Sequence, residues 1–217
     1  MTQNIDNQLN ISTIIFDFGG VLVDLDTSAC LAAFNKLGFS LISNLIDHYQ
    51  QKGLLLDFEE GKISTETFFE KMQELMGNNT PISAIGEAYL AFLRDIPTAK
   101  LELLLELKKD YKVLLLSNIN AFIWEYSKKR FFETNGHTLS DYFDRCYLSF
   151  EMGVCKPNVA IYQQLLEKEN LNPQKCLYID DSQVNIAAGQ QFGFQTYYAQ
   201  KGEDFTEKIR EILKNNK

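Results

Sequence analysis

Four short, nearly continuous apolar runs constrain the fold of this chain more than any other feature of its sequence. They cover residues 12–18, 112–118, 145–150 and 175–181, and a fifth at 194–199 is similar. Such runs are typical of strands buried on both faces of a parallel sheet. Helical spacing separates them at 98–110, 120–136, 157–170 and 184–193, with Pro157 expected to begin a helix and Gly193 to end one. The alternation predicts an α/β protein with a doubly wound parallel sheet.

The segment between the first two strands departs from this alternation. It contains only helical patterns, at 28–38, 43–61, 64–77 and 82–96, and Ser64 is expected to cap the third of them. We therefore expect a core domain formed by residues 1–25 and 98–217, with a helical cap domain formed by residues 26–97. An insert directly after the first strand would lie over the carboxyl ends of the strands, where open α/β sheets bind ligands.

Charge and composition argue against several classes of function. The 217 residues carry a formal net charge of -8 and no Lys/Arg block, which argues against nucleic acid as a partner. No apolar run is long enough to cross a bilayer, and the polar N-terminus lacks a signal-peptide apolar region. The four cysteines have no C-x-x-C or zinc-ligand spacing, so free thiols are expected. We expect a cytoplasmic protein without a membrane partner, either a monomer or a weak homodimer.

Polar side chains gather where the predicted strands end. They are Asp17 after the first strand, Ser117 and Asn118 after the second, and Asp180 and Asp181 after the fourth. Lys156 precedes a predicted helix, and Asn185 follows the aspartate pair by one helical turn. Each residue alone could cap a helix or start a turn. Their order, spacing and strand placement nevertheless agree with a single site.

Three carboxylates that converge at one sheet edge repel one another, so without a cation at least one pKa should rise sharply. Bound Mg²⁺ would remove this conflict, because Mg²⁺ uses a few carboxylates and fills its remaining positions with water. Lys156 would add a second positive charge. A cation and a lysine beside a nucleophilic carboxylate are suited to a dianionic phosphoryl group.

Four motifs carry a resemblance to a known family. They are "DFGGVLVD" from Asp17, the Ser117 of "LLLSN", the Lys156 of "GVCKP", and "YIDDSQVN" around Asp180 and Asp181. Together they resemble the haloacid dehalogenase-like hydrolase superfamily over nearly the whole chain, and the insert resembles its first-type helical cap. "FDFGGVLVDLD", "VLLLSNIN" and "YLSFEMGVCKPNVAIYQQLLE" are similar to the branch that contains α-D-glucose-1-phosphatase. The resemblance implies a Rossmann-like core and a phosphatase acting on a small phosphorylated metabolite, such as a sugar phosphate.

The resemblance also implies a role for each motif residue. Asp17 would attack phosphorus and form an aspartyl-phosphate that water hydrolyses. Mg²⁺ would bind the Asp17 carboxylate, the Gly19 carbonyl and Asp181, with Asp180 close by, and Asn185 would support the Asp181 loop. The phosphoryl group would be held by Lys156, by the side chains of Ser117 and Asn118, and by the backbone amides of Phe18, Gly19 and Gly20.

Gly19 departs from the family pattern, D-x-D, in which a second aspartate protonates the leaving oxygen and later activates water. Loss of such a group typically costs about 10²–10⁴-fold in rate. The enzyme is therefore expected to favour leaving groups that need little protonation, such as sugar 1-phosphates or acyl phosphates. Asp24 is a candidate substitute, although a structural role is the favoured interpretation, and mutase activity is not expected.

Three alternatives stay open from the sequence. A 2-haloacid dehalogenase also lacks the second aspartate, but it works without metal and has no pair equivalent to Asp180 and Asp181. A non-catalytic phosphometabolite-binding protein would account for Gly19, although Asp17 and Lys156 are intact. A receiver-type signalling domain uses similar residues, but its connections are short, unlike the insert of roughly 70 residues. The substrate itself is not readable from the sequence.

Overall fold

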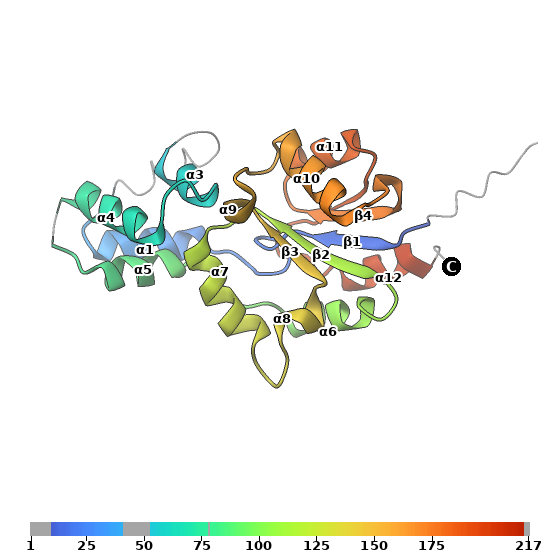
Figure 1. Cartoon of the computed structure of the whole chain (residues 1–217). Coiled ribbons are helices and arrows are strands. Elements are labelled where there is room, and N and C mark those ends of the chain that lie inside the picture. Colours follow the sequence, from blue (N-terminus) through green and yellow to red (C-terminus); the bar gives the residue numbers. More distant parts are fainter. Residues whose placement is uncertain (1–9, 41–52, 78, 215–217) are drawn as a thin grey trace, which may run out of the picture.

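A five-stranded parallel sheet forms the centre of the structure (Figure 1), a computed structural model that describes residues 10–40, 53–77 and 79–214. The strand order is β3-β2-β1-β4-β5, which confirms the predicted α/β class with a parallel sheet. The strands are β1 (Thr13–Phe16), β2 (Lys112–Ser117), β3 (Arg145–Leu148), β4 (Cys176–Asp180) and β5 (Gln195–Tyr198).

Helices cover both faces of the sheet, as the doubly wound class requires (Figure 1). One face is covered by α10 (Val159–Glu169) and α11 (Gln183–Gln191), and the other by α6 (Thr98–Leu107), α7 (Ala121–Ser127), α8 (Leu139–Tyr142) and α12 (Thr206–Lys214). Neighbouring strand residues point to opposite faces. Ile15 accordingly packs in the core beneath α10 and α11, whereas Ile14 and Phe16 pack in the core on the other side.

Several predicted boundaries are wrong. The helix expected at 82–96, for example, ends at Leu90. The helix expected to begin at Pro157 begins at Val159, because the Asn158 side chain caps it by accepting the Ala160 amide at 3.0 Å. The strand expected at 145–150 ends at Leu148, and its last two residues enter the short helix α9 (Ser149–Met152). The helix expected at 120–136 divides into α7 and the π-helix η1 (Lys128–Phe132), which ends as Phe131 and Phe132 turn into the core.

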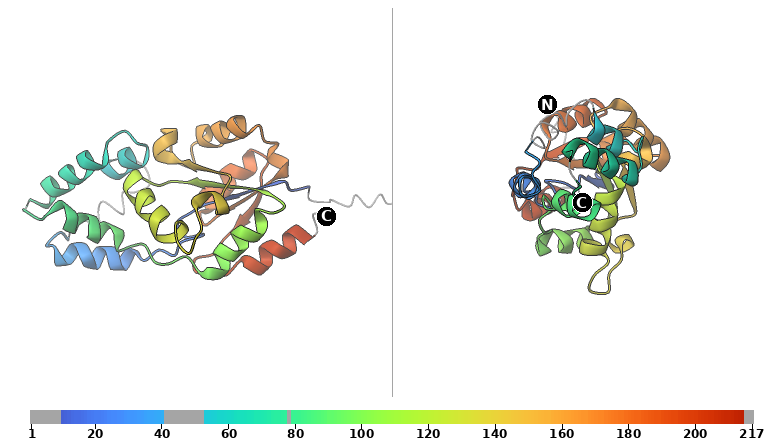
Figure 2. Two further views of the ribbon diagram at one scale, coloured as in Figure 1. Left: turned by 60° about the horizontal axis from the view of Figure 1, so that its bottom comes forward. Right: turned by 90° about the vertical axis from the view of Figure 1, so that its left-hand side faces the viewer.

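The segment between β1 and α6 is helical, as predicted, and lies beyond the carboxyl ends of the strands (Figures 1 and 2). Its described helices are α1 (Thr27–Lys36), α3 (Leu54–Glu59), α4 (Thr65–Met76) and α5 (Ile82–Leu90). Ser64 caps α4 by accepting the Thr67 amide at 3.1 Å. The helix predicted at 43–61 lies outside the described residues up to residue 52. No helix in the described part of the chain could span a bilayer.

The helical insert has its own apolar core, which contains Phe34, Phe58, Phe68 and Ile85. Two short extended segments join the insert to the sheet domain, and Leu25 pairs with Leu93 in an antiparallel bridge between them. A separate core and a paired junction are what an inserted unit needs to hold its own shape. The remaining short element is the 3-10 helix η2 (Pro173–Lys175) before β4.

Candidate active site

The strand order brings the predicted polar residues to one edge of the sheet. β1 lies between β2 and β4, so Asp17, Ser117 and Asp180 stand at the ends of three adjacent parallel strands. The Asp17 amide donates to the Ile179 carbonyl at 2.9 Å and extends the ladder by one residue. Carboxylate oxygens of Asp17, Asp180 and Asp181 lie within 4.8 Å of one another. The structure therefore brings Asp17 into one cluster with Asp180 and Asp181, which lie more than 160 positions later in the sequence.

Lys156 is the cation of this cluster. Its Nζ lies 2.9 Å from Asp17 Oδ1 and 2.8 Å from Asp180 Oδ2, and it donates to the Leu116 carbonyl at 3.0 Å. The side chain is only 1% exposed, so these partners replace water as its solvation shell. A buried ion pair of this kind depends on every partner being present, because removal of one leaves an uncompensated charge.

Asn118 positions the backbone of Lys156. Its Oδ1 accepts the Lys156 amide at 2.7 Å, and its Nδ2 donates to the Lys156 carbonyl at 2.9 Å. The sequence predicts a substrate contact for Asn118, which stays a prediction, since Oδ1 and only one of the two Nδ2 protons are engaged with Lys156. Asn118 therefore supports the site by holding the lysine.

Asp180 is saturated with hydrogen bonds. Besides Lys156, it accepts from the Tyr178 hydroxyl, from the Ser182 amide at 2.8 Å, and from Asn185 Nδ2 at 3.1 and 3.2 Å. Asn185 thus supports Asp180, whereas the sequence predicts that it supports the Asp181 loop. Asp181 is half-buried and stands beside Gly20. The two aspartates therefore have different partners: Asp180 pairs with Lys156, and Asp181 faces Gly20 in the turn after β1.

The turn after Asp17 requires a glycine at position 20. Gly20 has a φ of +79°, and a Cβ there would lie 2.0 Å from Asp181 Oδ2. Its amide donates to the Val23 carbonyl at 2.9 Å, so it closes the turn and is not directed at a phosphoryl group. The Phe18 amide donates to Asp17 Oδ1 at 2.7 Å. Gly19 differs from Gly20, since its φ is not left-handed and an added Cβ would meet only Leu25 Cδ1, at 3.2 Å.

The cluster carries negative charge that its own residues do not neutralise. Burial raises the pKa of Asp17 to about 7 although Lys156 opposes the shift, and Asp180 and Asp181 add to it. Burial also raises the pKa of Asp181, with a further contribution from Asp180. For Lys156, burial lowers the pKa, but Asp17 and Asp180 outweigh burial and hold it above its usual value. Three close carboxylates with this charge balance fit a hard divalent cation such as Mg²⁺.

Without a bound cation, stability is expected to depend on pH through Asp17. An unfolded aspartate titrates near 3.8 and folded Asp17 near 7, so the folded state holds the extra proton between these values. The contribution of Asp17 to the free energy of unfolding should therefore fall as pH rises across this window, by up to about 1.4 kcal/mol per pH unit. Denaturant unfolding in a chelator measures this slope against Asp17→Asn, and equal slopes in both proteins would contradict the shifted titration.

The contact of Tyr178 with Asp180 was not predicted from the sequence. Tyr178 lies two residues before Asp180 on the same face of β4, and strand alternation could have indicated their contact.

Asp24, the candidate substitute acid, lies 3.6 Å from the buried Nζ of Lys100, which donates to the Val21 carbonyl at 2.7 Å. This arrangement supports the structural role for Asp24. All four cysteines are free, as predicted.

Comparison with known proteins supplies the family. A family model described as haloacid dehalogenase-like hydrolase matches residues 11–193. The chain belongs to the haloacid dehalogenase-like hydrolase family. This confirms the superfamily that the four motifs resemble, while the finer placement in the α-D-glucose-1-phosphatase branch stays a prediction.

Relatives of this hydrolase include proteins of similar length. It is 35% identical to a D-ribitol-5-phosphate phosphatase of Bacteroides thetaiotaomicron, over 94% of this chain and 98% of that protein. The crystal structure of a family enzyme from the same organism, in complex with magnesium and inorganic phosphate, matches with a TM-score of 0.86 and 37% identity, over 92% of this chain and all of that one. The structure of an L-2-haloacid dehalogenase of Xanthobacter autotrophicus matches with a TM-score of 0.61 and 18% identity, over 94% of this chain and 83% of that one. This match shows the fold alone.

Proposed function

We propose that this protein is a Mg²⁺-dependent phosphomonoester hydrolase that acts on a small phosphorylated metabolite, with sugar and polyol phosphates as the preferred class. The observation that carries the proposal is the buried Asp17 paired with Lys156 at 2.9 Å, beside two further carboxylates within 4.8 Å. The relative named for ribitol phosphate and the family enzyme bound to magnesium and phosphate support the same chemistry.

The metal would be held by the carboxylates of Asp17 and Asp181 and by the backbone carbonyl of Gly19, with Asp180 alongside. When bound, Mg²⁺ supplies positive charge that offsets the carboxylates and the phosphoryl oxygens. The hydrogen bonds that saturate Asp180 make it the weaker candidate for direct ligation. Its task in the proposed mechanism is to hold Lys156 in place.

Asp17 is the proposed nucleophile. Its carboxylate oxygen attacks phosphorus, and the bond to the leaving oxygen breaks with its electron pair going to that oxygen, which takes a proton from water. The resulting aspartyl-phosphate is then hydrolysed by water. Lys156 lowers the pKa of Asp17 against the effect of burial and draws a phosphoryl oxygen toward the carboxylate, while Ser117 donates to another. Of the three turn amides, that of Gly19 is left to donate to the phosphoryl group, because the Phe18 amide donates to Asp17 Oδ1 and the Gly20 amide donates to the Val23 carbonyl.

We also propose that residues 26–97 form a cap, named the cap from here on, that covers this site. α3 and the loop after it pack against α9, which directly follows β3 at the ligand edge of the sheet. Gly61 lies against this helix, where an added Cβ would be 2.1 Å from the Phe150 carbonyl oxygen. Lys62, in the same loop, pairs with Glu60 at 2.5 Å and is a candidate in the cap for contact with a substrate.

The alternatives are less well supported. A metal-independent dehalogenase does not need three clustered carboxylates, and the dehalogenase structure shares only the fold. A non-catalytic binding protein would not need the ion pair between Lys156 and Asp17. Gly19 is the feature that both alternatives would explain.

The test is phosphate release from a panel that contains ribitol 5-phosphate, sugar 1-phosphates and acetyl phosphate, with Mg²⁺ or with a chelator. We expect Mg²⁺-dependent release by the wild type and none by Asp17→Asn. Halide release from 2-chloropropionate in the chelator would instead establish the dehalogenase. Tight Mg²⁺-dependent ligand binding with no turnover would establish the binding protein.

A further inference from the structure

The cap contacts the core near the loop that follows β2. This loop runs from Ser117, the proposed phosphate ligand, through residues 118–120 into α7. Two core side chains at this loop, Asn120 and Ser149, bond to the cap, although neither belongs to the four motifs. Both are buried, with exposed fractions of 1% and 0%.

Ser149 joins three segments through one hydroxyl group. Its Oγ accepts the Ile119 amide at 2.9 Å, and it lies 2.7 Å from the Glu59 carbonyl and 3.0 Å from the Ile119 carbonyl. A hydroxyl can donate one hydrogen bond at a time, and in this geometry it donates to the closer Glu59 carbonyl of α3. Ser149 therefore ties α3 of the cap to the residue two positions after Ser117.

Asn120 makes the second connection. Its Oδ1 accepts the Ile123 amide at 3.0 Å and caps α7, and its Nδ2 donates to the Tyr89 hydroxyl of α5 at 3.0 Å. The side chain thus fixes the end of the loop in two directions at once. Movement of α5 away from the core would break the bond to Tyr89, while the helix cap would remain.

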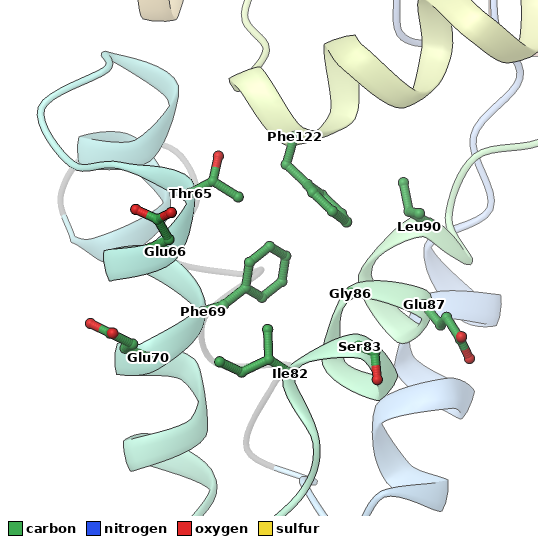
Figure 3. A pocket seen from close by; sticks show the side chains of 10 residues that line it. All are labelled: Thr65, Glu66, Phe69, Glu70, Ile82, Ser83, Gly86, Glu87, Leu90 and Phe122. Atoms are coloured by element: carbon green, nitrogen blue, oxygen red, sulfur yellow. The ribbon is translucent and has the colours of Figure 1, made fainter.

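The apolar contacts between the cap and the core do not by themselves fix the orientation of the cap. Phe122 of α7 reaches between α4 and α5 and lies over Gly86 (Figure 3). Its ring packs edge-on against the ring of Phe69, with 4.7 Å between the ring centroids. An open cavity of about 360 Å³ lies beside these rings. Apolar contacts are non-directional, and the cavity leaves the rings room to shift. The direction of docking therefore comes from the hydrogen bonds of Asn120 and Ser149.

We propose that Ser149, Asn120 and Tyr89 are positioning residues that couple docking of the cap to binding of a phosphoryl group at Ser117. The inference rests on the proposed function of this site. Binding that orders the Ser117 loop would favour the docked cap, and by reciprocity a docked cap would raise affinity for phosphate. None of the three side chains needs to touch the substrate for this effect.

The test is calorimetric binding of inorganic phosphate in the presence of MgCl₂. Tyr89→Phe removes the cap side of one bond and keeps the ring, and we expect its phosphate dissociation constant to rise about 2- to 10-fold. Ser149→Ala should act in the same direction. The matched controls are Tyr126→Phe, whose hydroxyl accepts from Arg130 within α7 and η1, and Ser64→Ala, which weakens a cap helix by removing its N-terminal cap. Both controls should bind phosphate like the wild type.

A double variant separates coupling from general loosening of the fold. In a Ser117→Ala background, Tyr89→Phe should cause little further loss of phosphate affinity, because the loop no longer contributes its ligand. Unchanged affinity in Tyr89→Phe, or an equal loss with and without Ser117, would overturn the coupling. Neither result depends on turnover, so the proposed hydrolase activity is judged separately by Mg²⁺-dependent phosphate release. Failure of the wild type to bind phosphate would overturn both proposals.

Discussion

Gly19→Asp is expected to hydrolyse alkyl phosphates such as ribitol 5-phosphate about 10²-fold faster than the wild type. The new carboxyl group would supply the proton that the leaving oxygen needs and would later activate water. The backbone at Gly19 accepts a side chain, because its φ is not left-handed and an added Cβ meets only the movable end of Leu25. The gain should be much smaller for acetyl phosphate, whose leaving group departs without protonation.

The measurement is kcat for both substrates under saturating Mg²⁺. Gly19→Asn is the matched control, since it has nearly the same shape and no proton to transfer. We expect it to be no faster than the wild type on either substrate. An unchanged rate in Gly19→Asp for every substrate, or an equal gain in Gly19→Asn, would mean that another group already performs the acid/base step.

Lys156→Met is expected to lower kcat/KM by about 10²–10³-fold or more, because it removes a fixed positive charge from the transition state. It should also destabilise the fold by about 3–5 kcal/mol, since Asp17 and Asp180 lose the cation that lies 2.9 and 2.8 Å from them. Added Mg²⁺ should restore part of the stability and little of the activity. Phosphate release and thermal unfolding with and without Mg²⁺ measure the two effects.

Lys100→Met is the control for burial of a lysine. Lys100 is also buried, at 3% exposure, and its Nζ donates to the Val21 carbonyl and pairs with Asp24 outside the carboxylate cluster. We expect a loss of stability and a change of kcat within about tenfold, since only the end of the turn after Asp17 is released. If both variants lost activity equally, the effect of Lys156 would be one of folding and not of charge at phosphorus.

The sequence by itself determined the class of fold and the place of the site. Short apolar runs without alternation are typical of strands covered on both faces, and parallel strands end at one edge. Asp17, Ser117 and Asp180 were predicted to lie at that edge because each directly ends such a run or lies just beyond it. The helical nature of the insert was equally readable, since the Ser64 cap and the apolar spacing are local signals.

The tertiary structure alone decided which partner each polar side chain takes. The bonds of Asn118 to Lys156 and of Ser149 to Glu59 join residues 38 and 90 positions apart. Side chains with several donors and acceptors can satisfy them in many ways, and packing selects one. The strand order that sets β1 between β2 and β4, the division of tasks between Asp180 and Asp181, and the contacts between cap and core all depend on such long-range contacts, which no local pattern encodes.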